Sequence, residues 1–528
     1  MSEHLGAPGD TFDRAIELRL VGDFAEQGRR IRELGPAVLR DGRLHLVLDL
    51  SGLEADSDII RHELARLLIR RAGWRLPPAI EDGAALWLAQ TGQPDSAATV
   101  WYGRSWRQWL PELVAMDVLP STDELLMTER PYDGSRVLWT PVAAAVVDAL
   151  EGETLARKLD PMPSPKAGRD LVAGVLRELE TSANQQTPSR SHPAVRRAGR
   201  SSGGFQNGVA FAMANGVDTG YHAPSAERRL DLLRGLGVDS VSVMPFAYQR
   251  NPEKPAMAFL NRHPASETDV GVIHAARQAK KRGMTVMWKP HLWIGHHSWP
   301  GDVTMGSEAD WSTWFHVYRR YVVHHAVLAE HAGADWFAIG VELGQTVHRE
   351  TEWRHLIGSV RRVYSGHLTY AGNWWGDYDK VPFWDALDAV GIDAYFPLSD
   401  DEDADLATLR RGARNVVSQL QAAAERWDRP VLLTEVGFAA RRSPWASPHE
   451  EGGTVSEVDQ RLAWQVLLSE LGKPSWLLGL HAWKVFTHPR GEGLGKPDFR
   501  FVGRPAQQVL EAYFRTEPGV VSVDLTGR

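Results

Sequence analysis

The sequence contains no cysteine. This absence excludes disulfide bonds, thiolate nucleophiles and cysteine-ligated metals, but it does not identify the compartment, because proteins without disulfides occur on both sides of membranes. The sequence also lacks any run of about 18 apolar residues, so no membrane span is expected. Its first residues show neither a basic start nor an apolar segment, so no signal peptide is visible. We therefore expect a cytoplasmic protein, or an extracytoplasmic one if a leader has been removed.

The chain has no excess of positive charge. Lys and Arg number 59 against 67 Asp and Glu, for a net charge of -8, so nucleic acid and anionic membranes are not expected partners. At 528 residues the chain predicts two domains, one of them large enough for a barrel. Tryptophan is plentiful, and 15 of the 21 tryptophans follow residue 280. That half is where we expect aromatic binding surfaces.

Residues 44–50 predict a strand and residues 58–72 an amphipathic helix. The helix carries His62 and Glu63, but a zinc peptidase needs a second histidine four residues after the first, and Arg66 occupies that position. A cation there would repel zinc and could instead pair with Glu63 or Asp82. The alternatives are an ordinary amphipathic helix with a coincidental His-Glu pair, and a working metallopeptidase, which would need bound zinc.

Residues 77–88 resemble the helix that supplies the third zinc ligand in gluzincin metallopeptidases, with Asp82 at the ligand position. The resemblance implies that residues 40–160 form a degenerate gluzincin-like module within a domain spanning 1–180. Residues 181–204 are rich in Ser, Pro and Gly and carry four arginines, so they predict a linker.

After the linker, eight short apolar runs alternate with amphipathic helical patterns, which predicts a (β/α)₈ barrel over residues 205–520. A doubly wound sheet would also alternate, but the first strand is not followed by a glycine-rich phosphate turn. The expected strands are 208–211, 240–244, 285–288, 336–341, 368–371, 389–392, 431–433 and 477–480. The expected helices are 225–236, 268–282, 309–331, 351–363, 404–427 and 457–471, with a last one after Pro505.

Function in such a barrel lies where the strands end. Polar and aromatic residues recur at those positions: Lys289, His291, Glu342, Asn373, Trp374, Asp393, Tyr395, Glu435, His481 and Trp483. Two of them, Glu342 and Glu435, follow the fourth and seventh strands and would meet at one rim. Such a pair is what glycoside cleavage needs, with one carboxyl protonating the departing oxygen and the other attacking the anomeric carbon. A salt bridge at the rim is the alternative role of each glutamate.

Six motifs in order resemble glycoside hydrolase family 113 over residues 205–515. They are 288–291 (Trp-Lys-Pro-His), 298–302 (Ser-Trp-Pro-Gly-Asp), 339–343 (Ile-Gly-Val-Glu-Leu), 368–374 (Leu-Thr-Tyr-Ala-Gly-Asn-Trp), 391–398 (Gly-Ile-Asp-Ala-Tyr-Phe-Pro-Leu) and 434–438 (Thr-Glu-Val-Gly-Phe). The resemblance implies a retaining (β/α)₈ hydrolase of β-1,4-mannan. It implies Glu342 as acid/base, Glu435 as nucleophile, Tyr395 as a hydrogen-bond partner of the nucleophile, and Trp483 as the floor of the subsite where cleavage occurs.

One position departs from the wider clan. The residue before the acid/base is usually an Asn that contacts the sugar 2-hydroxyl, whereas here it is Val341. We further expect Lys289, His291, Asn373 and Trp374 to contact the polysaccharide or oligosaccharide substrate, although His291 could equally be structural. No metal or other cofactor is expected. The competing functional hypothesis is a carbohydrate-binding or cell-surface assembly protein with a barrel that has lost turnover.

Overall fold

The computed structural model describes residues 204–519, except 215–218, 261–266, 296–297 and 490–494, together with parts of the first 185 residues. The chain divides into two compact units. The first contains Met1–Arg196 and His316–His331, and the second contains Arg197–Phe315 and Ala332–Arg528. Within the described residues, no helix has the combination of length and low polarity that crossing a bilayer requires.

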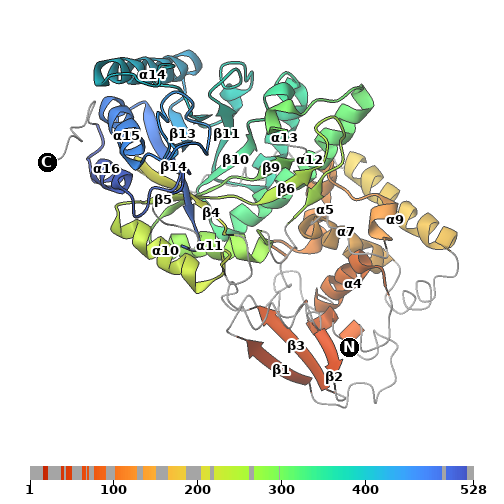
Figure 1. The fold of residues 1–528 in the computed structure, drawn as a ribbon. Helices are drawn as coiled ribbons and strands as arrows, with labels where there is room; N and C mark the ends of the chain where they lie inside the picture. Colours follow the sequence, from red (N-terminus) through yellow and green to blue (C-terminus); the bar gives the residue numbers. More distant parts are fainter. Residues whose placement is uncertain are drawn as a thin grey trace. The chain divides into compact units, whose positions relative to one another are not determined.

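Eight strands of the second unit close into a barrel (Figure 1), in which every neighbouring pair is parallel. The barrel follows chain order: β4 (Gln206–Ala212), β5 (Ser240–Val243), β8 (Thr285–Trp288), β10 (Trp336–Val341), β11 (His367–Asn373), β12 (Val390–Asp393), β13 (Val431–Val436) and β14 (Leu477–Phe486). The predicted (β/α)₈ fold is confirmed. Because all strands run the same way, their carboxyl ends share one rim.

The helices of the second unit lie around the strands (Figure 1): α10 (Pro224–Gly235), α11 (Asp269–Lys281), α13 (Glu350–Val363), α14 (Leu406–Trp427), α15 (Glu457–Leu471) and α16 (Pro505–Phe514). Helix α12 (Glu308–Ala332) is divided, with His316–His331 in the first unit. Several begin where the sequence supplies a cap. The side chains of Thr268, Asp405 and Ser456 each accept a hydrogen bond from a backbone N–H in the first turn of α11, α14 and α15. The strands they cover are largely apolar, and all six residues of β10 and of β13 are buried.

The rim departs from the prediction in two places. Strand β14 continues to Phe486, so Trp483 lies within the strand. A small second sheet also forms, in the order β7 (Ala258–Phe259), β6 (Phe246–Gln249) and β9 (His291–Ile294). Parallel pairing of β6 with β9 puts Phe246 opposite His291. This pairing joins segments about 45 residues apart in sequence, so local pattern alone did not predict it.

In the first unit, strands β1 (Ile16–Val21), β2 (Ala37–Arg40) and β3 (Arg43–Asp49) form a sheet in the order β1-β3-β2. The helices are α4 (Pro78–Gln90), α5 (Trp106–Ala115), α6 (Thr122–Leu125), α7 (Arg136–Ala149) and α9 (Pro165–Gln185). Helix α4 packs so closely on α7 that a Cβ at Gly83 would lie 2.4 Å from the carbonyl carbon of Ala143. Residues 181–185 of the predicted linker are helical at the end of α9, and residues 186–203 lie outside the described part, so the linker stays a prediction.

Cations surround the residue at the presumed third zinc-ligand position. Arg66 Nη1 lies 3.5 Å from Asp82 Oδ1, and Arg136 Nε lies 3.0 Å from Asp82 Oδ2. His62 Nε2 donates to the Asp82 carbonyl oxygen at 3.0 Å, while His62 Nδ1 accepts from Arg136 Nη2 at 3.3 Å. The pairing of Arg66 with Asp82 is confirmed. Because both ring nitrogens of His62 are engaged and Asp82 faces two guanidinium groups, this arrangement disfavours a metal. The gluzincin resemblance itself stays a prediction.

Candidate active site

Glu342 follows the last residue of β10 in an unusual backbone conformation. Its φ of 53° is left-handed, which costs a non-glycine residue free energy and is found preferentially at functional sites. Its side chain is half-buried and held at both oxygens. Trp299 Nε1 donates to Oε2 at 2.6 Å, and Asn373 Nδ2 donates to Oε1 at 2.7 Å. The carboxyl group therefore has a fixed orientation at the rim.

Glu435 lies on β13 and is buried, with 6% exposure. The Tyr395 hydroxyl donates to Oε2 at 2.7 Å, and the Lys289 ammonium donates to Oε1 at 2.5 Å. His291 Nε2 lies 3.9 Å from Oε1. A cation and a phenol together favour the ionised carboxylate. Each oxygen of the Glu435 carboxyl group thus has its own donor, an ammonium at Oε1 and a phenol at Oε2.

Lys289 connects Glu435 to a second carboxyl group, Asp393 at the end of β12. Its ammonium lies 3.0 Å from Asp393 Oδ1, which also accepts a hydrogen bond from Thr434 Oγ1 at 2.7 Å. Burial opposes the charged ammonium, but Asp393 and Glu435 outweigh it and raise the pKa of Lys289. Burial and the charge on Glu435 raise the pKa of Asp393 well above its usual range. If Asp393 keeps a proton, the net charge of Lys289 and the two carboxyl groups together is close to zero.

The buried position of Lys289 does not support the sugar contact predicted for it, because its side chain has 0% exposure. Lys289→Met is expected to lower the free energy of unfolding by ~3–5 kcal/mol, because the buried carboxyl groups of Asp393 and Glu435 lose the cation that they share. Chemical denaturation followed by circular dichroism measures this loss. The exposed Lys380→Met is the control, and equal stability of the two variants would contradict the role of the buried cation.

The two glutamates have different surroundings. Burial and, next, the negative charge of Glu435 raise the pKa of Glu342 to about 7, although the hydrogen bonds from Trp299 and Asn373 act in the opposite direction. A carboxylic acid that keeps its proton near neutral pH can act as a proton donor, while a neighbouring carboxyl group that faces a cation can act as a nucleophile. The arrangement can therefore carry out acid-assisted displacement.

Aromatic rings line the rim beside Glu435. His291 stacks on Trp483 with ring centroids 6.4 Å apart, and burial lowers the pKa of His291 well below its usual value, so the ring is neutral. Trp483 is half-buried, and the peptide bond that follows it is cis. Trp374 is also half-buried and packs on Phe396 and His449. Both tryptophans contact one apolar cluster formed by Tyr395, Ala439 and Phe499.

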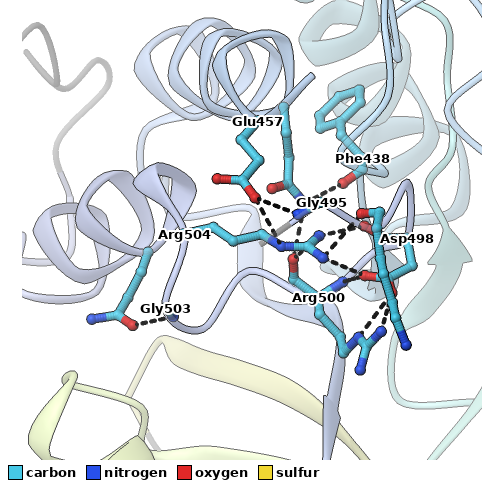
Figure 2. A network of polar contacts seen from close by, with 10 residues as sticks. Phe438, Glu457, Gly495, Asp498, Arg500, Gly503 and Arg504 are labelled. Atoms are coloured by element: carbon cyan, nitrogen blue, oxygen red, sulfur yellow. Dashed lines mark hydrogen bonds and ion pairs between the residues drawn. The ribbon is translucent and has the colours of Figure 1, made fainter. Parts of the chain in front are cut away.

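A polar network holds the loop that carries Phe499. Figure 2 shows Arg504 reaching across this loop to Asp498, with Arg500 and Glu457 close by. Arg504 donates to the carbonyl oxygens of Lys496, Asp498 and Arg500 at 2.7–3.0 Å and pairs with the Asp498 carboxylate at 2.9 Å. Phe499 then packs edge-on against Tyr395, with centroids 5.8 Å apart. The network thereby supports the tyrosine that contacts Glu435.

Sequence reasoning missed some of these contacts. Trp299 lies in the 298–302 motif, but nothing in a local pattern shows that its indole reaches Glu342, 43 residues away. The sequence places Asp393 at the rim without showing its partners, and it does not single out Trp375, which is 69% exposed. Val341 is 5% exposed and offers no polar group, so the clan's sugar contact at this position is missing.

Comparison with known proteins agrees with this geometry. The model of Glycoside Hydrolase Family 113 matches residues 209–503, more than half of the chain. The chain belongs to glycoside hydrolase family 113. The matched segment contains Lys289, Glu342, Tyr395, Glu435 and Trp483. The protein is accordingly a glycoside hydrolase with a carbohydrate substrate, and the predicted family is confirmed for the barrel.

Solved family 113 structures resemble the barrel. A β-mannanase from Alicyclobacillus acidocaldarius, AaManA in complex with ManMIm, is 25% identical with a TM-score of 0.53, over 59% of this chain and 97% of that one. A β-1,4-mannanase of the same family, solved as a complex, is 24% identical with a TM-score of 0.53, over 60% of this chain and 100% of that one. A search of curated proteins returns no match. Of the first unit, Met1–Arg196 lie outside the segment matched by the family model, whereas His316–His331 lie within it.

Proposed function

We propose that this family 113 enzyme is a retaining β-mannanase in which Glu342 is the acid/base and Glu435 the nucleophile. The observation that carries the assignment is the difference between the two carboxyl groups. Glu435 faces the Lys289 ammonium and the Tyr395 hydroxyl, whereas burial and the Glu435 charge raise the pKa of Glu342 to about 7. In the first step a proton donor and an anionic nucleophile are needed at the same time.

The reaction proceeds in two displacements. Protonated Glu342 gives its proton to the glycosidic oxygen while a Glu435 oxygen attacks the anomeric carbon, so that the bond to the leaving sugar breaks and a glycosyl ester forms. Glu342, now a carboxylate, removes a proton from water, whose oxygen attacks the same carbon and releases Glu435. Two inversions return the starting configuration. We expect the two carboxyl groups to lie ~5 Å apart, the separation typical of retention.

Mannan is supported as the substrate by similarity rather than by a contact. AaManA, at 25% identity over nearly its whole length, is named a β-mannanase. Wild-type protein incubated with β-1,4-mannan, glucomannan, cellulose and peptidoglycan fragments is expected to release reducing ends from mannan. Proton NMR of the first product should show the β-anomer before mutarotation. Binding without release would favour the non-catalytic alternative, and the α-anomer first would contradict retention.

Exposed tryptophans beside the acid/base support cleavage within a chain. Trp293 is 60% exposed on β9, and Trp375 is 69% exposed after β11. Strands β8 and β11 are the neighbours of β10, so these rings belong to segments on either side of Glu342. The leaving sugar departs toward the proton donor, and exposed indoles offer its further residues apolar faces for stacking.

Trp375→Ala is accordingly expected to raise KM for mannohexaose by about threefold to tenfold, from the loss of ~0.5–1.5 kcal/mol of stacking. Steady-state kinetics measure the effect. The matched control is Trp375→Phe, which keeps an aromatic face and should retain most of the affinity. A short aryl mannoside that does not reach these positions should be unaffected. An equal rise in KM for both substrates would contradict a binding role on the leaving-group side.

A further inference from the structure

Asp377 is a buried carboxyl group beside the rim that the reaction as described does not use. It is 1% exposed and lies four residues after the end of β11. Its Oδ2 accepts a hydrogen bond from the Asn373 backbone N–H at 3.2 Å and another from the Tyr370 hydroxyl at 3.1 Å. Burial raises its pKa to about 7 despite these two donors. A carboxyl group in this position is costly for the fold.

Both of its hydrogen-bond donors lead directly to Glu342. The Asn373 side chain donates from Nδ2 to Glu342 Oε1 at 2.7 Å. The Tyr370 hydroxyl accepts from the N–H of Leu343, the residue that follows Glu342, at 2.7 Å. One oxygen of Asp377 is thus connected to the carboxyl end of the Glu342 side chain and to the peptide that ends its left-handed turn.

The direction of each hydrogen bond depends on Asp377. A phenol has a single proton, so Tyr370 can best accept from Leu343 when it donates to Asp377. Edge contacts with Trp353 and Phe383 fix the Tyr370 ring. Only the direction of its hydroxyl proton can then change. On the other side, Asn373 Oδ1 accepts from the Trp375 N–H at 2.7 Å, which turns Nδ2 toward Glu342.

We propose that Asp377 is a positioning residue for the acid/base, holding Asn373 and Tyr370 so that Glu342 points at the glycosidic oxygen. The inference rests on the proposed function of Glu342. A positioning role can be distinguished from a purely structural one, because a misplaced proton donor slows only the step that needs its proton. An activated leaving group departs without being protonated, whereas a sugar leaving group needs a proton from the general acid.

The test compares two substrates, mannohexaose and 2,4-dinitrophenyl β-mannotrioside. Asp377→Ala is expected to lower kcat/KM for mannohexaose by about tenfold to a hundredfold, the scale of a small misplacement of a catalytic group. The rate of dinitrophenolate release in a pre-steady-state burst should be unchanged. Asp377→Asn keeps an acceptor oxygen and should restore most of the activity on mannohexaose. Asp379→Ala, an exposed carboxylate in the same loop, is the control.

Tyr370→Phe provides an independent variant if Asp377→Ala does not fold. It removes the hydroxyl between Asp377 and Leu343 while keeping the ring, and we expect the same loss on mannohexaose only. An equal loss on both substrates, or no loss on either, would overturn the positioning role while leaving the proposed function intact. Absence of turnover by wild-type protein on both substrates would overturn the proposed function and this inference with it.

Discussion

Glu435→Ala is expected to lower kcat on β-1,4-mannan by on the order of 10⁴- to 10⁶-fold, the range measured when one member of a covalent catalytic unit is removed. The physical reason is that no other described carboxylate receives both a cation and a phenol at the rim. Alanine leaves Lys289 paired with Asp393 alone. Reducing-end assays at saturating mannan measure the loss.

Chemical rescue separates loss of the nucleophile from loss of structure. Azide added to Glu435→Ala with a dinitrophenyl β-mannoside should occupy the space of the missing carboxylate and attack the anomeric carbon once, giving the α-mannosyl azide. Glu425→Ala, an exposed carboxylate on α14, is the matched control and should keep full activity. Undiminished hydrolysis by Glu435→Ala would remove the proposed mechanism.

Glu342→Gln is expected to lower kcat/KM on mannan by about 10²- to 10⁴-fold, the usual contribution of general acid catalysis. Burial and the charge on Glu435 raise the pKa of Glu342 to about 7, and the first step needs the protonated form. The wild-type rate should therefore fall as the pH rises through about 7. Because glutamine does not titrate, this alkaline limb should be lost in the variant. A pH profile of kcat/KM measures both effects.

The pH profile must distinguish Glu342 from Asp377, because burial raises the pKa of Asp377 to about 7 as well. Asp377→Asn removes its titration, so the alkaline limb should persist in this variant if Glu342 is responsible. His291 and Tyr395 do not interfere, since their pKa values lie well below and well above this range. An alkaline limb that survives in Glu342→Gln and disappears in Asp377→Asn would reassign the titrating group.

Much of the barrel could be predicted because its strands are short apolar runs covered on both faces. The predicted strand 336–341 and the observed β10, Trp336–Val341, coincide, and helix α15 begins and ends at the predicted residues. The small β7-β6-β9 sheet was missed because pairing between distant segments leaves no periodic signal in either one. The length of β14 was underestimated, since His481 and Lys484 interrupt its apolar run.

The sequence by itself determined the alternation of strands and helices, through its apolar periodicity, and the family, through its motifs. It also predicted the pair Glu342 and Glu435, because that prediction depends on residue type at two strand ends. Only the tertiary structure decided what surrounds each carboxyl group. Lys289 reaches Glu435 across 146 residues of sequence, and Trp299 reaches Glu342 across 43. Protonation follows from burial and from the charges nearby, and both exist only once barrel closure has brought separate strand ends together.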